Sequence, residues 1–301
     1  MSNLAPIALF TYNRPWHTQQ TVEALQKNKL SSESELFIYS DDAKNDDARV
    51  SVDEVRKYID NITGFKKITV IKRDKNWGLA NSIIDGVTKI VNEYGRIIVL
   101  EDDLVTSSYF LKFMNEALWF YKDEREIMSI SGYAYNFTMS PQYDKDVFLY
   151  YRPSSWGWAT WKDEWNLVDF NITNECEIFT NKKIQKRFNR GGDDLFDMLK
   201  MQMEGKINSW AIRFALSHSL NNKFGLFPIQ SLVQNIGHDN SGTHCGNTDI
   251  WDVLLDDEFL PKLNTIKIDS IIVTNIQKRL NKTFFQKNKF YLRKLIKWIL
   301  S

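Results

Sequence analysis

Three consecutive acidic residues, Glu101, Asp102 and Asp103, directly follow an apolar segment at residues 97–100. Carboxylates at the end of a buried strand are costly unless solvent or a cation satisfies them. Hard divalent cations such as Mn²⁺ and Mg²⁺ prefer carboxylate oxygens and keep positions open for phosphate oxygens. A cation held here would bridge a diphosphate and neutralise charge on a leaving group. The triplet therefore predicts a metal and phosphate site. The plainer interpretation is an acid-rich helix N-terminus.

Polar clusters also follow the three earlier apolar segments, at residues 11–15, 40–42 and 73–81. The first places an Arg and an Asn where they suit a base or a phosphate. The second offers a carboxylate to a uracil N–H or a ribose hydroxyl. Taken alone, the first of these segments fits an ordinary strand-to-helix turn better, and the second a solvated loop. The third contains an Asn-x-Gly-x-Ala sequence, in which small residues let the backbone pass close to a ligand. The candidate nucleotide-sugar-binding residues are Thr11, Asn13, Arg14, Asp42, Asn76, Gly78, Glu101 and Asp102.

These clusters need elements that bring them together, and the first hundred residues alternate strand and helix patterns. Strands are predicted at residues 7–12, 36–39, 68–71 and 97–100, and helices at 16–27, 52–59 and 79–92. This repetition predicts an α/β fold, with a largely parallel sheet and helices on both faces. Ligands bind such sheets at the carboxyl ends of the strands, where the polar clusters lie.

The second half is less regular. Helices are predicted at residues 109–122, 182–203 (interrupted at Gly191-Gly192) and 209–220, and strands at 127–131, 147–151 and 229–234. A Trp-rich stretch occupies residues 155–161, and a loop rich in Gly, His and Asn occupies 237–246.

Composition bounds the class of protein. Of 301 residues, 43% are hydrophobic and 26% charged, which suits a soluble globular chain. Ten Trp residues suggest either a cleft lined with rings that stack on sugars or a Trp-rich core. Two Cys residues, no signal-like N-terminus and no apolar run of about 20 residues predict a cytoplasmic protein.

The four clusters, in this order, resemble the nucleotide-binding half of GT-A glycosyltransferases. Residues 6–14 and 76–82 look like glycosyltransferase family 2, and Val99–Leu104 with Gly157-Trp158 looks like the N-acetylglucosaminyltransferase I family. The resemblance spans roughly residues 5–245. It implies a GT-A fold with a nucleotide-sugar-binding half at 1–105 and an acceptor-binding half at 106–275. The charge and the pattern of the sequence add a basic amphipathic tail at 276–301.

The resemblance also implies roles for single residues. Asp103 matches the direct ligand of Mn²⁺ or Mg²⁺, Asp102 the acid that contacts ribose or sugar, and Glu101 a supporting acid. Asp42 matches the acid that reads uracil, and Arg14 the basic residue beside the base and phosphates. The implied sugar and acceptor platform comprises Trp156, Gly157, Trp158, Trp210 and Arg213. His244 is the implied second metal ligand, with His238 as the other candidate.

An inverting transfer needs a base that takes the proton of the acceptor hydroxyl. Asn208 and Ser209 stand where the resemblance leads us to expect an acid, so the base stays open. Glu204 is the candidate adopted, and Asp193 and Asp194 are the other nearby acids.

The implied function is transfer of a sugar from a nucleotide diphosphate sugar, a UDP-sugar by the match of Asp42, to a glycan or lipid-linked glycan. The setting implied is bacterial-type surface polysaccharide or glycoconjugate assembly. Two alternatives share the fold: a non-catalytic sugar-binding protein, and a nucleotidyltransferase. The second needs a Gly-rich basic loop after the first strand, where this chain has Thr-Tyr-Asn-Arg-Pro.

The C-terminal tail is basic. Eight Lys or Arg residues lie at or beyond Lys278, and their removal leaves 31 basic against 38 acidic residues in the body. Leu292, Leu295, Ile296 and Ile299 share a helical face, which predicts an interfacial helix on an anionic membrane surface at the cytosolic face of the inner membrane. The alternative is a helix packed on the body. The acidic body and the absence of a nucleic-acid-binding motif argue against nucleic acid as a partner.

Overall fold

The computed structural model describes residues 4–137, 139, 142–241 and 248–281. The first half contains β1 (Ile7–Thr11), α1 (Pro15–Gln26), η1 (Ser31–Glu33), β2 (Glu35–Ser40), α2 (Asp46–Ile59), β3 (Lys67–Lys72), α3 (Leu79–Tyr94), β4 (Arg96–Glu101), β5 (Leu104–Thr106) and α4 (Phe110–Phe120). All the strands and helices predicted up to residue 122 are confirmed. Helix α2 begins earlier than predicted because Asn45 caps it, its Oδ1 accepting from the amide of Ala48 at 3.2 Å.

The second half contains β6 (Ile127–Ser131), β7 (Val147–Tyr150), β8 (Trp158–Trp161), α5 (Lys162–Trp165), α6 (Glu175–Thr180), α7 (Lys182–Phe188), η2 (Asn189–Gly191), α8 (Leu195–Met203), α9 (Trp210–Leu220), β9 (Phe224–Pro228), β10 (Val233–Asn235) and α10 (Ser270–Leu280). The sequence reasoning missed β5, β8 and β9, and the strand predicted at 229–234 is wrong over most of its length. Strand β8 was missed because its four residues, Trp-Ala-Thr-Trp, lie within a stretch that was interpreted only as Trp-rich.

One eight-stranded sheet organises the molecule, in the order β3-β2-β1-β4-β8-β6-β9-β7. Strands β3, β2, β1 and β4 are parallel, while β8 lies antiparallel between β4 and β6. The predicted α/β class, with a mostly parallel sheet between helices, is confirmed. Because β8 pairs with β4, strands from before and after residue 105 share this sheet, and the division into two halves at that residue stays a prediction.

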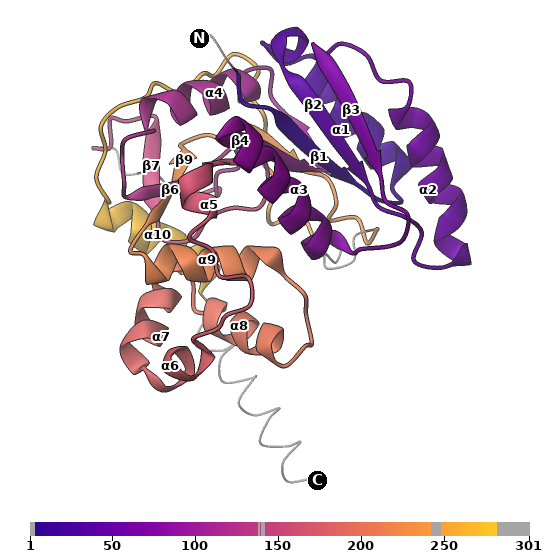
Figure 1. Ribbon diagram of the computed structural model, residues 1–301. Helices are drawn as coiled ribbons and strands as arrows, with labels where there is room; N and C mark the ends of the chain where they lie inside the picture. Colours follow the sequence, from indigo (N-terminus) through magenta and orange to yellow (C-terminus); the bar gives the residue numbers. More distant parts are fainter. Residues whose placement is uncertain (1–3, 138, 140–141, 242–247, 282–301) are drawn as a thin grey trace.

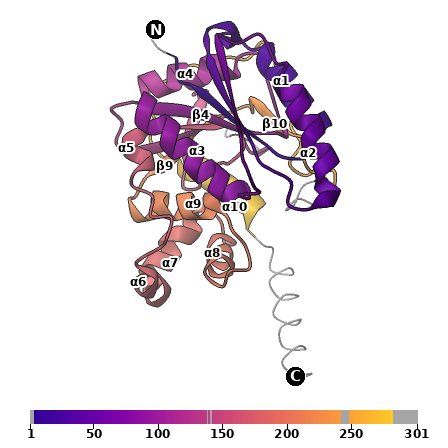
Figure 2. The same cartoon turned by 45° about the vertical axis from the view of Figure 1, so that its right-hand side comes forward.

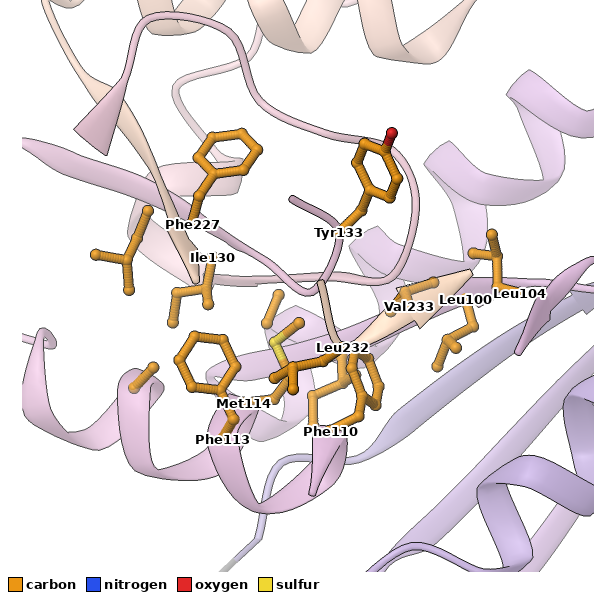
Figure 3. Packing of buried hydrophobic residues seen from close by; sticks show 14 of the residues in the cluster. Leu100, Leu104, Phe110, Phe113, Met114, Ile130, Tyr133, Phe227, Leu232 and Val233 are labelled. Atoms are coloured by element: carbon orange, nitrogen blue, oxygen red, sulfur yellow. The ribbon is translucent and has the colours of Figure 1, made fainter. Parts of the chain in front are cut away.

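The alternation of side chains along each central strand feeds two cores. Ile7 and Leu9 of β1 pack with α1, α2 and α4, whereas Ala8 and Phe10 pack with α3 and α9 on the other face. Figure 1 shows α3 covering one face of the sheet, with α1 and α2 on the other. The first core continues under the second half of the chain, where Phe110, Leu232 and Val233 pack together (Figure 3).

Helices α6, α7 and α8 form a lobe beneath α9, with a small hydrophobic core of its own (Figures 1 and 2). Within the described ranges, no helix combines the length and the hydrophobicity that crossing a membrane requires.

Helix α10 crosses the boundary predicted at residue 276. Ile272 and Ile276 are fully buried in the main core, so the residues of this helix pack on the body. A C-terminal helix is therefore present, but it begins at Ser270. The face formed by Leu292, Leu295, Ile296 and Ile299 lies outside the described residues.

His218 on α9 is fully buried, with Nδ1 2.9 Å from the carbonyl oxygen of Phe214 and Nε2 2.9 Å from the hydroxyl of Ser129. Burial lowers its pKa to about 3, against an ordinary value of about 6.5. Between these two values the unfolded chain binds a proton that the folded chain does not, so stability falls as the pH falls below about 6.5.

We therefore expect the free energy of unfolding of the wild type to fall by about 1.4 kcal/mol more than that of His218→Gln when the pH drops from about 7.5 to 5.5. Urea unfolding of both proteins at the two pH values measures this difference. Equal losses would show that burial does not lower the pKa of His218 in the folded protein.

Candidate active site

The acidic triplet closes β4 beside the end of β1, and Arg14 links the two. The Nη2 of Arg14 donates to Asp102 and, at 2.9 Å, to Oδ2 of Asp103. The amide of Tyr12 lies 3.4 Å from the other oxygen of Asp102. Burial lowers the pKa of Arg14, but Asp102 and Asp103 outweigh this effect and hold it above its ordinary value. Arg14 is thus a fixed positive charge between two aspartates that are 4% and 6% exposed.

Glu101 lies below these aspartates and is held from the opposite face of the sheet. Trp210 of α9 makes a side-chain hydrogen bond to it, with the indole N–H as the donor. Burial, together with the charges of Asp103 and Asp102, raises the pKa of Glu101 to about 8. A third negative charge next to the two aspartates is therefore suppressed at neutral pH, and the supporting role expected for Glu101 stays a prediction.

The loop after β3 is fastened to the end of β2 by Asp41. Its two carboxylate oxygens accept from the amides of Trp77 and Gly78, each at 2.8 Å. Gly78 has φ +73°, a conformation that favours glycine. Asn76 adds a bond of 2.7 Å from its Nδ2 to the carbonyl of Asp42. Sequence reasoning missed Asp41, although the Asp-Asp pair after β2 was visible.

The carboxylate of Asp42 is held by two arginines of α2. Arg49 reaches it at 2.7 and 3.3 Å, and Nη1 of Arg56 lies 3.2 Å away. The hydrogen bond from Arg49 lowers the pKa of Asp42, so the residue is a carboxylate at neutral pH. The predicted contact of Asp42 with the base stays a prediction, and Arg49 is an additional group beside Asp42 that the sequence did not reveal.

The remaining residues predicted after β1 have different environments. Thr11 is buried, and its carbonyl accepts from the amide of Asp41 at 3.0 Å, so it joins β1 to the end of β2. Asn13 is half-buried in the turn that leads into α1. Its predicted contact with the nucleotide sugar stays a prediction.

A distant loop completes the site. Strand β10 pairs antiparallel with β5, and the amide of Ile236 donates to the carbonyl of Asp103 at 2.9 Å. Gly237 then passes so close that a Cβ added to it would lie 2.1 Å from Oδ2 of Asp103 and 2.9 Å from Nη1 of Arg14. Sequence reasoning did not single out Gly237, which packs against Asp103 and Arg14. Its place in a Gly- and His-rich loop after a strand was the available signal.

His238 follows Gly237, and its ring packs edge-to-face on Trp156 with centroids 5.3 Å apart. Both ring nitrogens are buried, and neither has a hydrogen-bond partner within the described part of the chain. The other candidate, His244, lies outside the described residues. His17 of α1 helps to hold this loop, since its Nε2 lies 3.0 Å from Oδ2 of Asp239.

The predicted aromatic platform divides into exposed and buried parts. Trp156 is half-buried and lines a cavity, and its predicted role as a sugar-facing ring stays a prediction. Trp158 has no exposed surface and is stacked on Trp165 and Trp210 in the core. Its prediction as a platform residue is therefore wrong, because the alternation of β8 turns it inward.

The other platform residues also have structural partners. The Cβ of any larger residue at Gly157 would lie 2.8 Å from Val233, so this glycine allows close packing beneath the site. Trp210 is buried and acts through Glu101. Arg213 donates to Ser209, Phe170 and Asn208, so all three arms of its guanidinium bind the chain itself.

Glu204, the adopted candidate for the base, ends α8 in the lobe beneath α9. Its side chain is half exposed and pairs with Lys206. The structure thus gives Glu204 an ion pair on the surface of the lobe, separate from the network of Arg14, Asp102 and Asp103.

The side chains of Asp103 and His238 are of types that can bind a divalent cation. Asp103 uses one carboxylate oxygen on Arg14, and its carboxylate makes no other bond within the described ranges. The unpartnered ring of His238 lies one residue from the glycine that packs on Asp103. Within those ranges, no group of three or more His, Cys, Asp and Glu side chains is arranged around one point. The fit therefore rests on Asp103, with phosphate oxygens needed to complete a coordination shell.

This geometry, with an acidic triplet at the end of β4 next to an arginine from the end of β1, can be compared with known families. Residues 7–118 match the family model described as glycosyl transferase family 2. The match confirms the predicted resemblance over β1 to α4, and with the sheet topology it confirms the GT-A fold class. Residues 119–245 lie beyond the family 2 match, so the resemblance predicted there stays a prediction, as does that to the N-acetylglucosaminyltransferase I family.

Solved structures show more distant similarity. TarS from S. aureus has 12% identity and a TM-score of 0.41 over 76% of this chain and 36% of its own. A TarS fragment of residues 1–349 has 12% identity and a TM-score of 0.40, covering 76% and 59% of the two chains. A mannosyltransferase from Pyrobaculum calidifontis, solved with GDP-Man and Mn²⁺, has 10% identity and a TM-score of 0.33, covering 45% and 37%. This chain thus spans less than two thirds of the length of each of these proteins. No curated protein matches it.

Proposed function

We propose that this protein is a metal-dependent glycosyltransferase that moves a sugar from a nucleotide diphosphate sugar to a glycan acceptor. One observation carries the proposal: the family 2 segment contains the Arg14, Asp102 and Asp103 network at the carboxyl ends of β1 and β4. Ligands of parallel α/β sheets bind at this edge. The hexose or N-acetylhexosamine nature of the donor, the acceptor and the pathway of surface polysaccharide assembly belong to the proposal.

Individual residues would have different roles in this transfer. Asp103 would hold Mn²⁺ or Mg²⁺, with His238 or His244 as the second side chain. When bound, the cation neutralises charge that develops on the departing diphosphate. Arg14 keeps both aspartates oriented, and its Nη1, which has no hydrogen-bond partner among the described residues, would be available to a phosphate oxygen. Glu101 supports the aspartates from below.

The donor is proposed to carry UDP. The carboxylate of Asp42 lies after β2, on the side of the site formed by the loop at Asn76 and Gly78. A carboxylate held ionised can accept from the N–H of uracil. Arg49 and Arg56 fix its orientation, which limits the hydrogen bonds that it offers to a base.

Three further parts of the proposal rest on resemblance or on sequence. Transfer is proposed to be inverting, and the base is open because Glu204 forms a surface ion pair. The acceptor is proposed to be a glycan or lipid-linked glycan. Docking of residues 282–301 on an anionic cytosolic leaflet is proposed from their sequence.

A thermal-shift experiment tests the proposal. We expect UDP together with Mn²⁺ to raise the melting temperature, because a ligand that binds only the folded state stabilises it. UDP without the metal, Mn²⁺ without nucleotide, and GDP or dTDP in place of UDP should raise it less. Slow release of UDP from a UDP-sugar should follow the same metal dependence. Stabilisation by UDP without any hydrolysis would favour the non-catalytic alternative, and a stronger effect of GDP or dTDP would reject UDP.

A further inference from the structure

A second concave feature lies beyond Trp156, away from the aspartates. It is a cavity of about 220 Å³, bordered by the ends of β6 and β7, the turn before β8, Trp251 and Leu280 of α10. This volume is below the roughly 300 Å³ at which pockets for drug-sized ligands begin, so it suits one sugar unit. Trp156 separates the cavity from the loop of Gly237 and His238, because its ring also contacts His238.

Aromatic rings form much of the wall. Tyr133 and Trp156 meet edge-to-face with centroids 4.6 Å apart, and Trp251 lies 6.4 Å from Trp156 at an interplanar angle of 74°. Tyr133 is anchored because its hydroxyl donates to the carbonyl of Trp251 at 3.2 Å. Fixed rings with different orientations offer both faces and edges, which suits the apolar C–H surfaces of a pyranose or a polyol.

Arg152 is the single charged residue among the described residues that line this cavity. It makes an ion pair with Asp194 through one nitrogen, Nη1, at 2.9 Å from each carboxylate oxygen. Asp194 does not line the cavity, so it holds the guanidinium from behind. A guanidinium has five N–H donors, and those of Nε and Nη2 make no other hydrogen bond within the described part of the chain.

The described lining of the cavity therefore contains one cationic side chain and no carboxylate. A second cation is near, since the guanidinium of Arg279 lies 5.6 Å from the ring centroid of Trp251. The hydroxyl of Ser155, on the rim of the cavity, makes no hydrogen bond to the described residues. A planar guanidinium presented beside aromatic rings is the arrangement that binds carboxylate or phosphate in two-point contact.

We propose that this cavity binds a sugar unit of the acceptor that carries an anionic group, a carboxylate or a phosphate, with its ring on Trp156 and its anion on Arg152. The proposal extends the proposed function and takes the acceptor role from it. The aspartates and the loop of Gly237 account for the donor side, and Trp156 stands between the two. The acceptor is thus selected by charge at a point separate from the reacting hydroxyl.

Binding to the full chain, measured by ligand-observed NMR without nucleotide or metal, tests the proposal. The probes are methyl glucuronide, a glucose phosphate, neutral methyl glucoside and inorganic phosphate. We expect at least one anionic sugar to bind about tenfold more tightly than methyl glucoside and than inorganic phosphate. Whether the glucuronide or the glucose phosphate binds better identifies the anion. Equal binding of methyl glucoside, preference for inorganic phosphate, or no binding of any sugar would overturn the proposal.

Two substitutions locate the binding. Arg152→Gln should lower the affinity for the preferred anionic sugar about tenfold while leaving that for methyl glucoside within about twofold. Because this change leaves Asp194 without its partner, Ser155→Glu provides a second route that keeps the ion pair and adds a repelling charge. Its neutral counterpart is Ser155→Gln. Arg187→Gln is the matched control, since Arg187 is half-buried, bonds to Asn222 and lies outside this cavity.

Anionic-sugar affinity that is unchanged in both Arg152→Gln and Ser155→Glu would place the binding elsewhere and reject the site. The outcome is distinct from that of the proposed function. Failure of UDP-sugar turnover with intact anionic-sugar binding would reject the activity and leave the cavity as a glycan-binding site. Turnover of the UDP-sugar without binding of an anionic sugar would support the activity and reject the cavity as a glycan-binding site.

Discussion

Asp103→Asn should abolish Mn²⁺-dependent binding of UDP and reduce donor hydrolysis by at least about 100-fold, because the ligand of the cation is lost together with several kcal/mol of charge stabilisation. The fold should survive, since Arg14 keeps its bond to Asp102 and the backbone carbonyl of Asp103 still accepts from Ile236. Calorimetric titration of UDP with and without Mn²⁺ measures the binding. Circular dichroism checks the fold.

The matched control for this prediction is Asp60→Asn, which removes an exposed carboxylate paired with Lys72 at 2.6 Å at the end of α2. We expect it to bind UDP and Mn²⁺ as the wild type does. If Asp103→Asn keeps metal-dependent binding, or if wild-type hydrolysis continues undiminished in EDTA, Asp103 is not the metal ligand.

Gly237→Ala should lower donor hydrolysis about 100-fold with the fold retained, because a displacement of about 1 Å at a reacting centre costs about that much. The new Cβ would lie 2.1 Å from Oδ2 of Asp103, so the carboxylate or the loop must move. The backbone of Gly237 is outside the positive-φ region, so the methyl group adds contact without conformational strain. Steady-state release of UDP and the affinity for Mn²⁺ in the presence of UDP are the two measurements.

Gly95→Ala is the control for the addition of a methyl group. Gly95 lies before the amino end of β4, opposite the site, with nothing within 4 Å of the added Cβ and φ +78°. It should lose about 1 kcal/mol of stability and keep its activity. Activity of Gly237→Ala equal to that of Gly95→Ala would show that the loop of Gly237 lies away from the aspartates when the donor is bound.

The sequence determined the first half of the fold and the position of the acids. The apolar segments that become β1 to β4 and the periodic patterns of α1 to α3 are local signals, and each predicted element is present. Because parallel strands have their carboxyl ends at one edge, this alternation was enough to bring Arg14 near Asp102 and Asp103. A short-range pattern and one rule of topology were therefore enough to predict this part of the site.

Only the tertiary structure decided which residues of the second half join the site. Gly237 meets Asp103 because β10 pairs with β5, two three-residue strands separated by more than a hundred residues. Strands this short carry no detectable periodicity, and their register depends on the core beneath them. Trp156 and Trp158 illustrate the same limit, since they are identical in type and two positions apart. The positive φ of Gly157 and the start of β8 leave one lining a cavity and bury the other. The composition shows that Trp is abundant, but it does not show which Trp side chains are buried. The burial of Trp158 depends on the pairing of β8 with β4 and β6 in the packed sheet.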